Sequence, residues 1–211
     1  MLAATTRTAL RARPASGLAM RSLSTLLVGE HDGEKLSEAT LSAVTACKAI
    51  GGDVELLLGG SSAKAAADSA CAVEGVSKIT FSESASLDKG IAEEWTPFIL
   101  AAQKASGATH VVSAASAFSK GAFPRVSALL DVAMITEVTG INDASTFVRP
   151  TYAGNAITTV SSSDDIKVCS GPRREVACRG SRGAGSCCVS IPSRHTSMTL
   201  ADCTRRPHRA P

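Results

Sequence analysis

Aromatic residues and long apolar runs are both scarce in this chain. Only 3% of its 211 residues are aromatic, comprising one tryptophan, one tyrosine and five phenylalanines. No run approaches the roughly 18 consecutive apolar residues that cross a bilayer, so we expect no membrane span. Apolar residues still make up 44% of the chain, which is enough to bury the core of one domain of ordinary size.

The sequence also lacks the motifs of common catalytic and metal sites. It contains no GxSxG nucleophile elbow, no HExxH helix and no CxxC pair. His110 begins an apolar strand and His31 lies in an acidic loop, so both are expected to be surface or packing residues rather than catalytic bases. The segment after Ser170 holds cysteines and histidines, but without the spacing or the apolar residues of a zinc site. We therefore expect no catalytic residue, no metal site, no disulfide and no autonomous enzyme.

Charge is distributed unevenly along the chain. Residues 1–21 hold four arginines and no acid, a net charge of +4. Residues 22–170 hold ten basic and seventeen acidic residues, a net charge of −7, and residues 171–211 hold eight arginines and two acids, a net charge of +6. The excess of basic residues thus belongs to the two terminal segments, so we expect the acidic central region to bind no nucleic acid.

The first segment has the composition of a mitochondrial transit peptide. It is rich in Arg, Ser, Thr and Ala and contains no acid. Arg7, Arg11 and Arg13 interrupt the continuous apolar run that a secretory signal needs. Because the residues at 21–24, Arg-Ser-Leu-Ser, resemble a processing site, we expect residues 1–23 to be removed and the mature protein to lie in the mitochondrial matrix. An ordinary disordered N-terminus is the alternative.

The central region alternates apolar strands with amphipathic helices. Strands are expected over 23–30, 53–60, 77–83, 109–116, 133–138 and 166–170, and helices over 36–50, 61–75, 91–105 and 124–130. Serine is expected to cap the second helix, and Pro97 is expected either in the first turn of the third helix or at a kink. This order predicts an α/β domain with a mainly parallel, twisted sheet flanked by helices.

Chemically distinctive residues are concentrated between Ala115 and Ala156. This stretch holds four of the seven aromatic residues and both arginines of residues 22–170. Its first part is expected to be a loop that leads into a helix, with Pro124 near the first turn. The run TFVRPTYAGNAITTV predicts two extended segments around a turn, an antiparallel extension in which Pro150 limits the first segment to an edge position.

Arg149 is the most distinctive polar residue of that extension. It lies beside Pro150, with Tyr152 and Asn155 close by in the sequence. A guanidinium group there is suited to hydrogen-bond backbone carbonyls or a carboxylate of a partner protein. We favour the internal role, because edge strands are usually covered in native folds.

Two motifs of this stretch resemble one protein family. ASAFxKxxxPRVxAxLxVAxITxV, followed closely by TFVRPxYAGNA, is similar to the alpha subunit of electron transfer flavoprotein. The resemblance extends over residues 24–170 and corresponds to the N-terminal domain of that family. It implies a Rossmann-like domain of the adenine nucleotide alpha hydrolase-like kind. The residues of the motifs that we single out for structural or interface roles are Arg125, Arg149, Tyr152, Gly154 and Asn155.

The resemblance also implies a function. Members of the family form a heterodimer with a beta subunit. Through FAD they carry electrons from acyl-CoA dehydrogenases of fatty acid beta-oxidation, and from other matrix dehydrogenases, to a membrane quinone oxidoreductase. In the family the C-terminal domain of the alpha subunit holds most of the flavin. None of the family's flavin motifs matches a position here, so we expect this truncated chain to bind no FAD.

Two alternatives stay open beside a redox-carrier subunit. The first is a nucleotide-binding module of the universal-stress type. It requires a glycine-rich phosphate loop near the last strand, where the chain instead has IKVCSGPRR, and the acids of GEHDG after the first strand would repel a pyrophosphate. The second is a structural partner of the beta subunit without a redox role, which differs from the carrier only in whether a longer product exists.

The composition changes abruptly after Ser170. Residues 171–211 contain no aromatic residue and no lysine, and only four large aliphatic residues. Such a segment buries too little surface to offset its chain entropy, so we expect disorder. Composition also suggests translation out of frame. If one base is dropped, GC-rich codons for Gly171 to Arg174 permit Val-Arg-Gly, the residues with which the family continues.

The genomic DNA tests this frame hypothesis. We expect the frame shifted by one base after Ser170 to stay open and to encode a glycine-rich flavin domain. Stop codons in that shifted frame would contradict the hypothesis.

Overall fold

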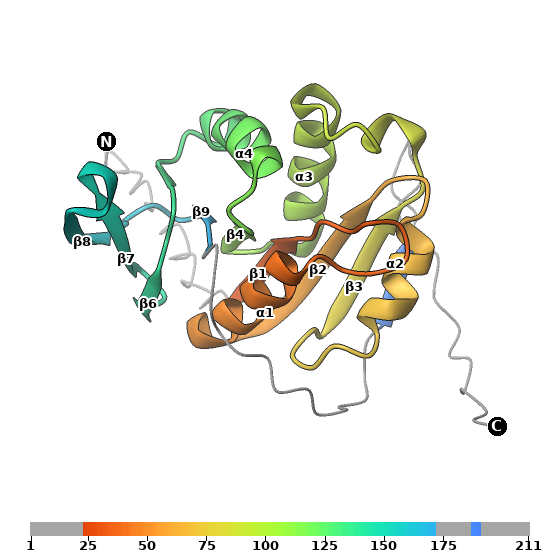
Figure 1. Cartoon of the computed structure of the whole chain (residues 1–211), viewed down its shortest axis with the longest axis horizontal. Coiled ribbons are helices and arrows are strands. Elements are labelled where there is room, and N and C mark those ends of the chain that lie inside the picture. The colour runs from red at the N-terminus through yellow and green to blue at the C-terminus, as the bar shows by residue number, and fades with distance from the viewer. Residues whose placement is uncertain (1–22, 172–186, 191–211) are drawn as a thin grey trace, which may run out of the picture.

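A seven-stranded parallel sheet forms the centre of the residues that the computed structural model describes, 23–171 and 187–190 (Figure 1). Its order is β10-β3-β2-β1-β4-β9-β5, and every neighbouring pair is parallel. The strands are β1 (Ser24–Val28), β2 (Asp53–Gly59), β3 (Lys78–Ser82), β4 (His110–Ser113), β5 (Met134–Ile135), β9 (Lys167–Ser170) and β10 (Cys187–Ser190). The predicted fold class, a mainly parallel Rossmann-like sheet with helices and an antiparallel extension, is confirmed.

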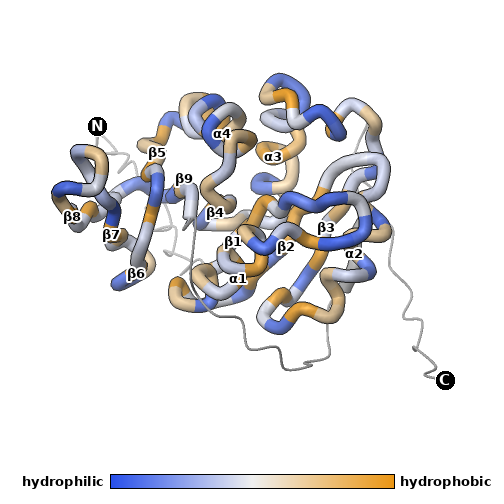
Figure 2. The backbone as a smooth tube through the Cα atoms, in the orientation of Figure 1, coloured by the Kyte–Doolittle hydropathy of each residue, from blue (hydrophilic) through white to orange (hydrophobic). Residues whose placement is uncertain are grey.

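Helices cover both faces of this sheet. They are α1 (Glu38–Ile50), α2 (Ala63–Ala70), α3 (Ala92–Ser106) and α4 (Ala117–Leu130), with a short 3₁₀ helix, η1, at Ala85–Leu87. Leu27 of β1 packs in one apolar cluster with residues of α1 and α2, whereas Leu26 and Val28 pack in a second cluster with residues of α3 and α4. Because both faces are buried, the central strands consist mainly of apolar residues, which Figure 2 shows as hydrophobic segments.

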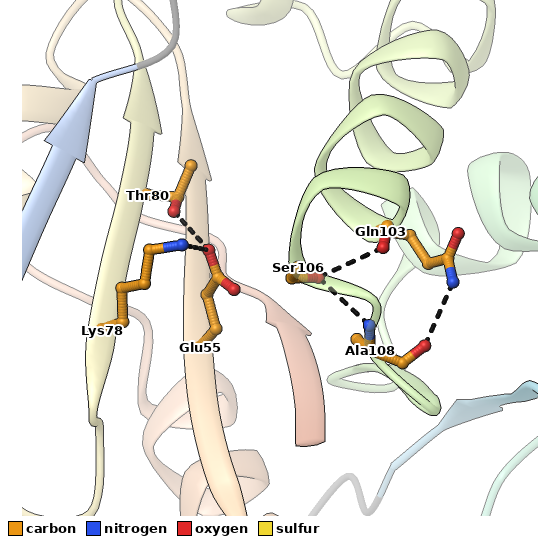
Figure 3. Close-up of polar contacts among 6 residues, drawn as sticks. All are labelled: Glu55, Lys78, Thr80, Gln103, Ser106 and Ala108. Carbon is orange, nitrogen blue, oxygen red and sulfur yellow. Dashed lines mark hydrogen bonds and ion pairs between the residues drawn. The ribbon is translucent and has the colours of Figure 1, made fainter. Parts of the chain in front are cut away.

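One acidic residue lies within the apolar strand β2. The side chain of Glu55 is only 14% exposed. Its Oε1 accepts hydrogen bonds from Lys78 Nζ at 2.8 Å and from Thr80 Oγ1 at 2.5 Å, both on β3 (Figure 3). The carboxylate is therefore paired across the strands, as a largely buried charge requires.

Helix α4 begins earlier than the sequence indicated. We expected it to start near Pro124, but it starts at Ala117, so Pro124 lies inside the helix. Ser116 and Ser119 form a capping box: Ser116 Oγ accepts from the Ser119 amide at 3.1 Å, and Ser119 Oγ accepts from the Ser116 amide at 3.0 Å. These bonds satisfy amide groups that a helix leaves free at its N-terminus, and they explain the early start.

The N-terminus of α2 differs from expectation. Ser62 precedes α2 but its side chain makes no capping hydrogen bond, so the predicted serine cap is wrong. Of the two positions expected for Pro97, the first turn is excluded, because Pro97 lies inside α3. At the end of α3, Gln103 Nε2 donates to the Ala108 carbonyl at 3.1 Å and fixes the turn into β4 (Figure 3).

A small antiparallel sheet projects at one end of the molecule and is called here the arm (Figure 1). It comprises β6 (Gly140–Asp143), β7 (Thr146–Thr151), η2 (Tyr152–Gly154) and β8 (Ala156–Ser161). The predicted edge position of Pro150 is wrong, because β7 is the central strand. Strand β6 pairs only with Thr146 to Val148 of β7, so Pro150 lies beyond its end, where no amide donor toward β6 is needed.

Two segments show strand boundaries that composition did not indicate. The strand expected over 133–138 is limited to β5, and Glu137 has a φ of 57°, which is incompatible with a strand. Disorder was expected over 171–211, but β10 within that segment pairs with β3. Backbone pairing needs no large apolar side chain, which is why composition missed it. Apart from Gly171 and β10, the expected tail lies outside the described residues, as do all residues of the predicted transit peptide except Leu23.

Removal of the Phe147 ring is expected to destabilise the domain strongly. Phe147 of β7 is fully buried in the same cluster as α1. Phe147→Ala should lower the free energy of unfolding of the full chain by about 3–5 kcal/mol in urea denaturation. Ile157→Ala, at a side chain of β8 that is 77% exposed, is the matched control and should change it by less than about 0.5 kcal/mol. Equal effects of the two substitutions would contradict this assignment of the core.

Candidate functional site

A cleft of about 510 Å³ lies at the carboxyl ends of β1 and β2. It is lined by the loop after β1, the loop between β2 and α2, the segment around η1, and the side chains of Trp95 and Phe118. The two rings meet edge to face with centroids 4.8 Å apart. Ligands of parallel α/β sheets bind at this edge, so the cleft is the first place to look for a nucleotide site.

The carboxylate of Asp88, which follows η1, contacts the loop between β2 and α2. Asp88 Oδ1 accepts a hydrogen bond from the Ser61 amide at 2.6 Å. That bond lowers the pKa of Asp88, since it favours the charged form. A Cβ on Gly60 would lie 2.9 Å from Asp88 Oδ1, and Gly60 has a φ of 138°, so glycine lets the acid approach the loop. The amide that a phosphate would use is thus already satisfied by an anion.

A second carboxylate lies where the strand order reverses, between β1 and β4. Glu30 follows β1, and its Oε1 accepts a hydrogen bond from Ser116 Oγ at the N-terminus of α4. Its backbone is held by Thr40 of α1, whose Oγ1 donates to the Glu30 carbonyl at 3.1 Å and accepts from the Glu30 amide at 3.0 Å. Asp32 and Asp88 also line the cleft, against one lysine, Lys89, so the charged residues of the lining carry a net negative charge that disfavours a phosphate group.

The two histidines of the described residues, His31 and His110, occupy different environments, and neither lies in a catalytic arrangement. His31 lines the cleft, and its Nε2 lies 3.2 Å from the Gly59 carbonyl. His110 is buried; its Nε2 lies 2.7 Å from the Ala144 carbonyl and its Nδ1 lies 2.9 Å from Thr109 Oγ1. His110 thus connects β4 of the main sheet to the turn between β6 and β7 of the arm, and acts as a packing residue.

A second groove, of about 560 Å³, lies along the arm and is called here the arm groove. Arg149, Tyr152 and Gly154, three of the five residues singled out from the motifs, line it together with Glu137. Asn155 follows directly, and its amide donates to the Tyr152 carbonyl at 3.1 Å.

The fifth motif residue, Arg125, lies apart from this groove. It is on α4, where its Nη1 lies 3.3 Å from Glu93 Oε1 of α3. The sequence did not predict that Glu137 lines this groove. Glu137 was expected within a strand, and its left-handed backbone conformation, with a φ of 57°, leaves no signal in the sequence.

Neither a reactive thiol nor a metal site is found among the described residues. Cys47, Cys71 and Cys169 are free thiols, and burial raises the pKa of Cys47 and raises that of Cys169 to about 12. Among the residues described, no group of three or more metal-ligating side chains comes together. No helix within 23–171 is long and apolar enough to cross a bilayer. The cysteine and histidine side chains considered for zinc after Ser170 lie outside the described residues.

Comparison with known proteins places this fold in a family. Residues 25–191 match the family described as "Electron transfer flavoprotein domain". The chain belongs to that family. The resemblance inferred from the two motifs is therefore confirmed, and the match runs beyond Ser170, where the sequence resemblance was expected to end. The domain boundary at that residue stays a prediction.

Several curated relatives are electron transfer flavoprotein alpha subunits by name. A Caenorhabditis elegans protein, "Probable electron transfer flavoprotein subunit alpha, mitochondrial", is 39% identical over 79% of this chain and 51% of its own length. The alpha subunit from Pseudomonas aeruginosa is 43% identical over 68% of this chain and 46% of its own length. The mitochondrial alpha subunit from Dictyostelium discoideum is 41% identical over 68% of this chain and 42% of its own length. The chain thus spans about half the length of the curated relatives it matches.

The buried histidine of this electron transfer flavoprotein domain should make its stability depend on pH. Burial lowers the pKa of His110 below 6.5, so unfolding takes up a proton between the folded pKa and 6.5. The free energy of unfolding is therefore highest, as far as His110 is concerned, above pH 6.5, where this residue is neutral in both states. It falls as the pH is lowered from 6.5 toward the folded pKa of His110. We expect His110→Gln to show a shallower dependence than wild type in urea denaturation between about pH 7 and about pH 5. Parallel curves would contradict the assignment.

Proposed function

We propose that this chain is the scaffold part of an electron transfer flavoprotein alpha subunit, a component of an electron carrier rather than an enzyme. The observation that carries the proposal is the family match over residues 25–191, together with relatives 38–43% identical that are all named as that subunit. The site chemistry agrees with a scaffold role, because neither described groove holds a nucleophile with a general base beside it.

In this proposal the intact protein pairs with a beta subunit and works in the mitochondrial matrix. It passes electrons through FAD from acyl-CoA and other matrix dehydrogenases to a membrane quinone oxidoreductase. The matrix location is supported by the acid-free, arginine-containing N-terminal segment and by the word "mitochondrial" in the names of the eukaryotic relatives.

The described residues of this chain do not fit FAD. The cofactor carries a pyrophosphate and an isoalloxazine ring, which need free amide donors and polar groups at the ring nitrogens. In the cleft the Ser61 amide is taken by Asp88, and Glu30 receives the Ser116 hydroxyl. We therefore assign no electron-transfer step to these residues, and the flavin of the intact family member is proposed to bind outside them.

One observation favours a second candidate, a nucleotide-binding module of the universal-stress type. The cleft lies at the edge of a Rossmann-like sheet where nucleotides commonly bind. Its acidic lining argues against that candidate. A structural partner of the beta subunit without a redox role makes the same contacts as the proposed scaffold.

Co-purification with the beta subunit tests the proposal. We expect the full chain to form a one-to-one complex with the beta subunit of the same organism. The chain alone should be colourless after desalting and should release no flavin on denaturation, because its described grooves lack a flavin site. Calorimetric titration with ATP should give no heat of binding. Failure to bind the beta subunit, or a stoichiometric nucleotide complex, would overturn the scaffold proposal.

A further inference from the structure

The cleft at the carboxyl ends of β1 and β2 carries an excess of negative charge. Its charged lining residues are Glu30, Asp32, Asp88 and Lys89, three acids against one base. A recessed site lined by charges of one sign raises the local concentration of ligands of the opposite sign. The cleft therefore favours a cationic occupant.

Two of these carboxylates have oxygen atoms left for such an occupant. Within the described part of the chain the Asp32 carboxylate accepts no hydrogen bond, and Glu30 uses only Oε1, toward Ser116 Oγ. Asp88, by contrast, is held by the Ser61 amide at 2.6 Å. Glu30 and Asp32 lie two residues apart on the loop after β1, so both are available to one cation.

Aromatic rings add to the affinity of the cleft for a planar cation. Trp95 and Phe118 both line it. Trp95 Nε1 donates to the Leu87 carbonyl at 2.9 Å, so the indole presents its ring to the cleft and its donor is already used. A guanidinium group pairs with carboxylates through a planar fork and also packs against aromatic rings. An arginine side chain thus fits this lining better than an ammonium group does.

Strand β10 brings the chain to this edge of the sheet. It runs parallel to β3, and its last residue, Ser190, pairs with Phe81. The carbonyl of the next residue of β3, Ser82, accepts a hydrogen bond from the Gly60 amide at 3.1 Å. Gly60 directly precedes Ser61, which lines the cleft. The chain therefore leaves β10 beside the cleft.

The residues after β10 supply the matching charge. Residues 191–211 contain four arginines and one acid, Asp202. The first of these arginines, Arg194, follows Ser190 by four residues, which span at most about 14 Å when extended. Only β3 separates β10 from β2, a distance of about 10 Å across the sheet. Arg194 can therefore reach the cleft, and a short tether gives it an effective concentration there on the order of millimolar.

We propose that the segment after β10, residues 191–211, folds back over the carboxyl edge of the sheet and places the guanidinium group of Arg194 in the cleft. There the group pairs with the carboxylates of Glu30 and Asp32. A segment of the chain itself then occupies the cleft, and a cationic ligand from solution has to displace it. The contact needs only the 211 residues of this chain, so it does not depend on the proposed function.

The other basic segment that leaves this edge is less well placed. It begins after Gly171, whose amide donates to the Ser113 carbonyl at 2.6 Å at the end of β4. Its arginines, such as Arg174, belong to the connection that has to return to the amino edge of the sheet, where Cys187 pairs with Lys78. Arg174 is therefore the matched control for Arg194.

Zero-length cross-linking of the full chain tests the contact. Residues 171–211 contain no lysine, so Arg194→Lys gives that segment a single side-chain amine and keeps the positive charge. A carbodiimide joins an amine to a carboxylate only where the two are in contact. We expect a cross-link within one chain from position 194 to Glu30 or Asp32, identified by mass spectrometry of the digested monomer. Its yield should fall at least about fivefold in about 0.5 M NaCl, which screens the attraction.

Two further variants separate this contact from general charge. Arg174→Lys moves the amine to the connection between β9 and β10 and should give a yield with the same two acids that is lower by at least about fivefold. Asp32→Asn, added to Arg194→Lys, removes one of the two carboxylates and should lower the total yield by at least about twofold.

Hydrogen exchange tests the arginine itself. At low salt, Arg194→Ala should speed exchange at the amides of residues 29–33 by about threefold or more, because the loop after β1 loses its cover. Arg174→Ala should leave this exchange at the wild-type rate.

Each other outcome overturns the inference. Equal cross-link yields from positions 174 and 194 would show an unspecific attraction of basic residues to the cleft. Cross-links found only in covalent dimers would show a contact between copies of the chain. A cross-link from position 194 only to acids outside the cleft, or no cross-link at all, would place the segment elsewhere. Exchange that is the same in wild type and Arg194→Ala would show that the native arginine does not contact the cleft.

Discussion

Burial of the central strands on both faces is the constraint on which the rest of the structure depends. Leu26, Leu27 and Val28 of β1 are all nearly or fully inaccessible, although successive side chains point to opposite faces. Helices must then cover both sides of the sheet. Because all strands of the sheet are parallel, the loops after them lie at a single edge, and the cleft lies at that edge.

The cleft has the position of a nucleotide site, but carboxylates of the described residues lie where a phosphate group would bind. A nucleotide-binding fold usually presents free amides at loops and helix N-termini, and here carboxylates of the chain lie at both places. Asp88 takes the amide of the loop before α2, and Glu30 meets the serine that caps α4. Both acids have a structural role. Asp88 holds η1 to the loop after β2, and Glu30 holds the N-terminus of α4 to the end of β1. A domain of this kind is suited to serve as a scaffold.

Buried contacts join the arm to α1 and to β4 of the main sheet, and other side chains of the arm are exposed. Phe147 packs into the cluster of α1, and His110 of β4 reaches the carbonyl of Ala144 beside β7. These contacts hold the arm at a defined place, while Tyr152 and Ile157 remain exposed on it. Strands held by buried contacts differ from an unpaired loop, because their backbone is already ordered by the fold.

The sequence by itself determined the order of the four helices, the order of the strands of the main sheet other than β10, and the turn around Gly154. Apolar periodicity and turn chemistry depend on neighbouring residues, so they can be read from the chain, and the motifs pointed to the family. Only the tertiary structure decided the central position of β7, the pairing of β10, the bond from the Ser61 amide to Asp88 and the unpaired Nε of Arg149. Each of these depends on partners, present or absent, that are distant in the sequence, and local composition carries no information about which distant groups the fold brings together.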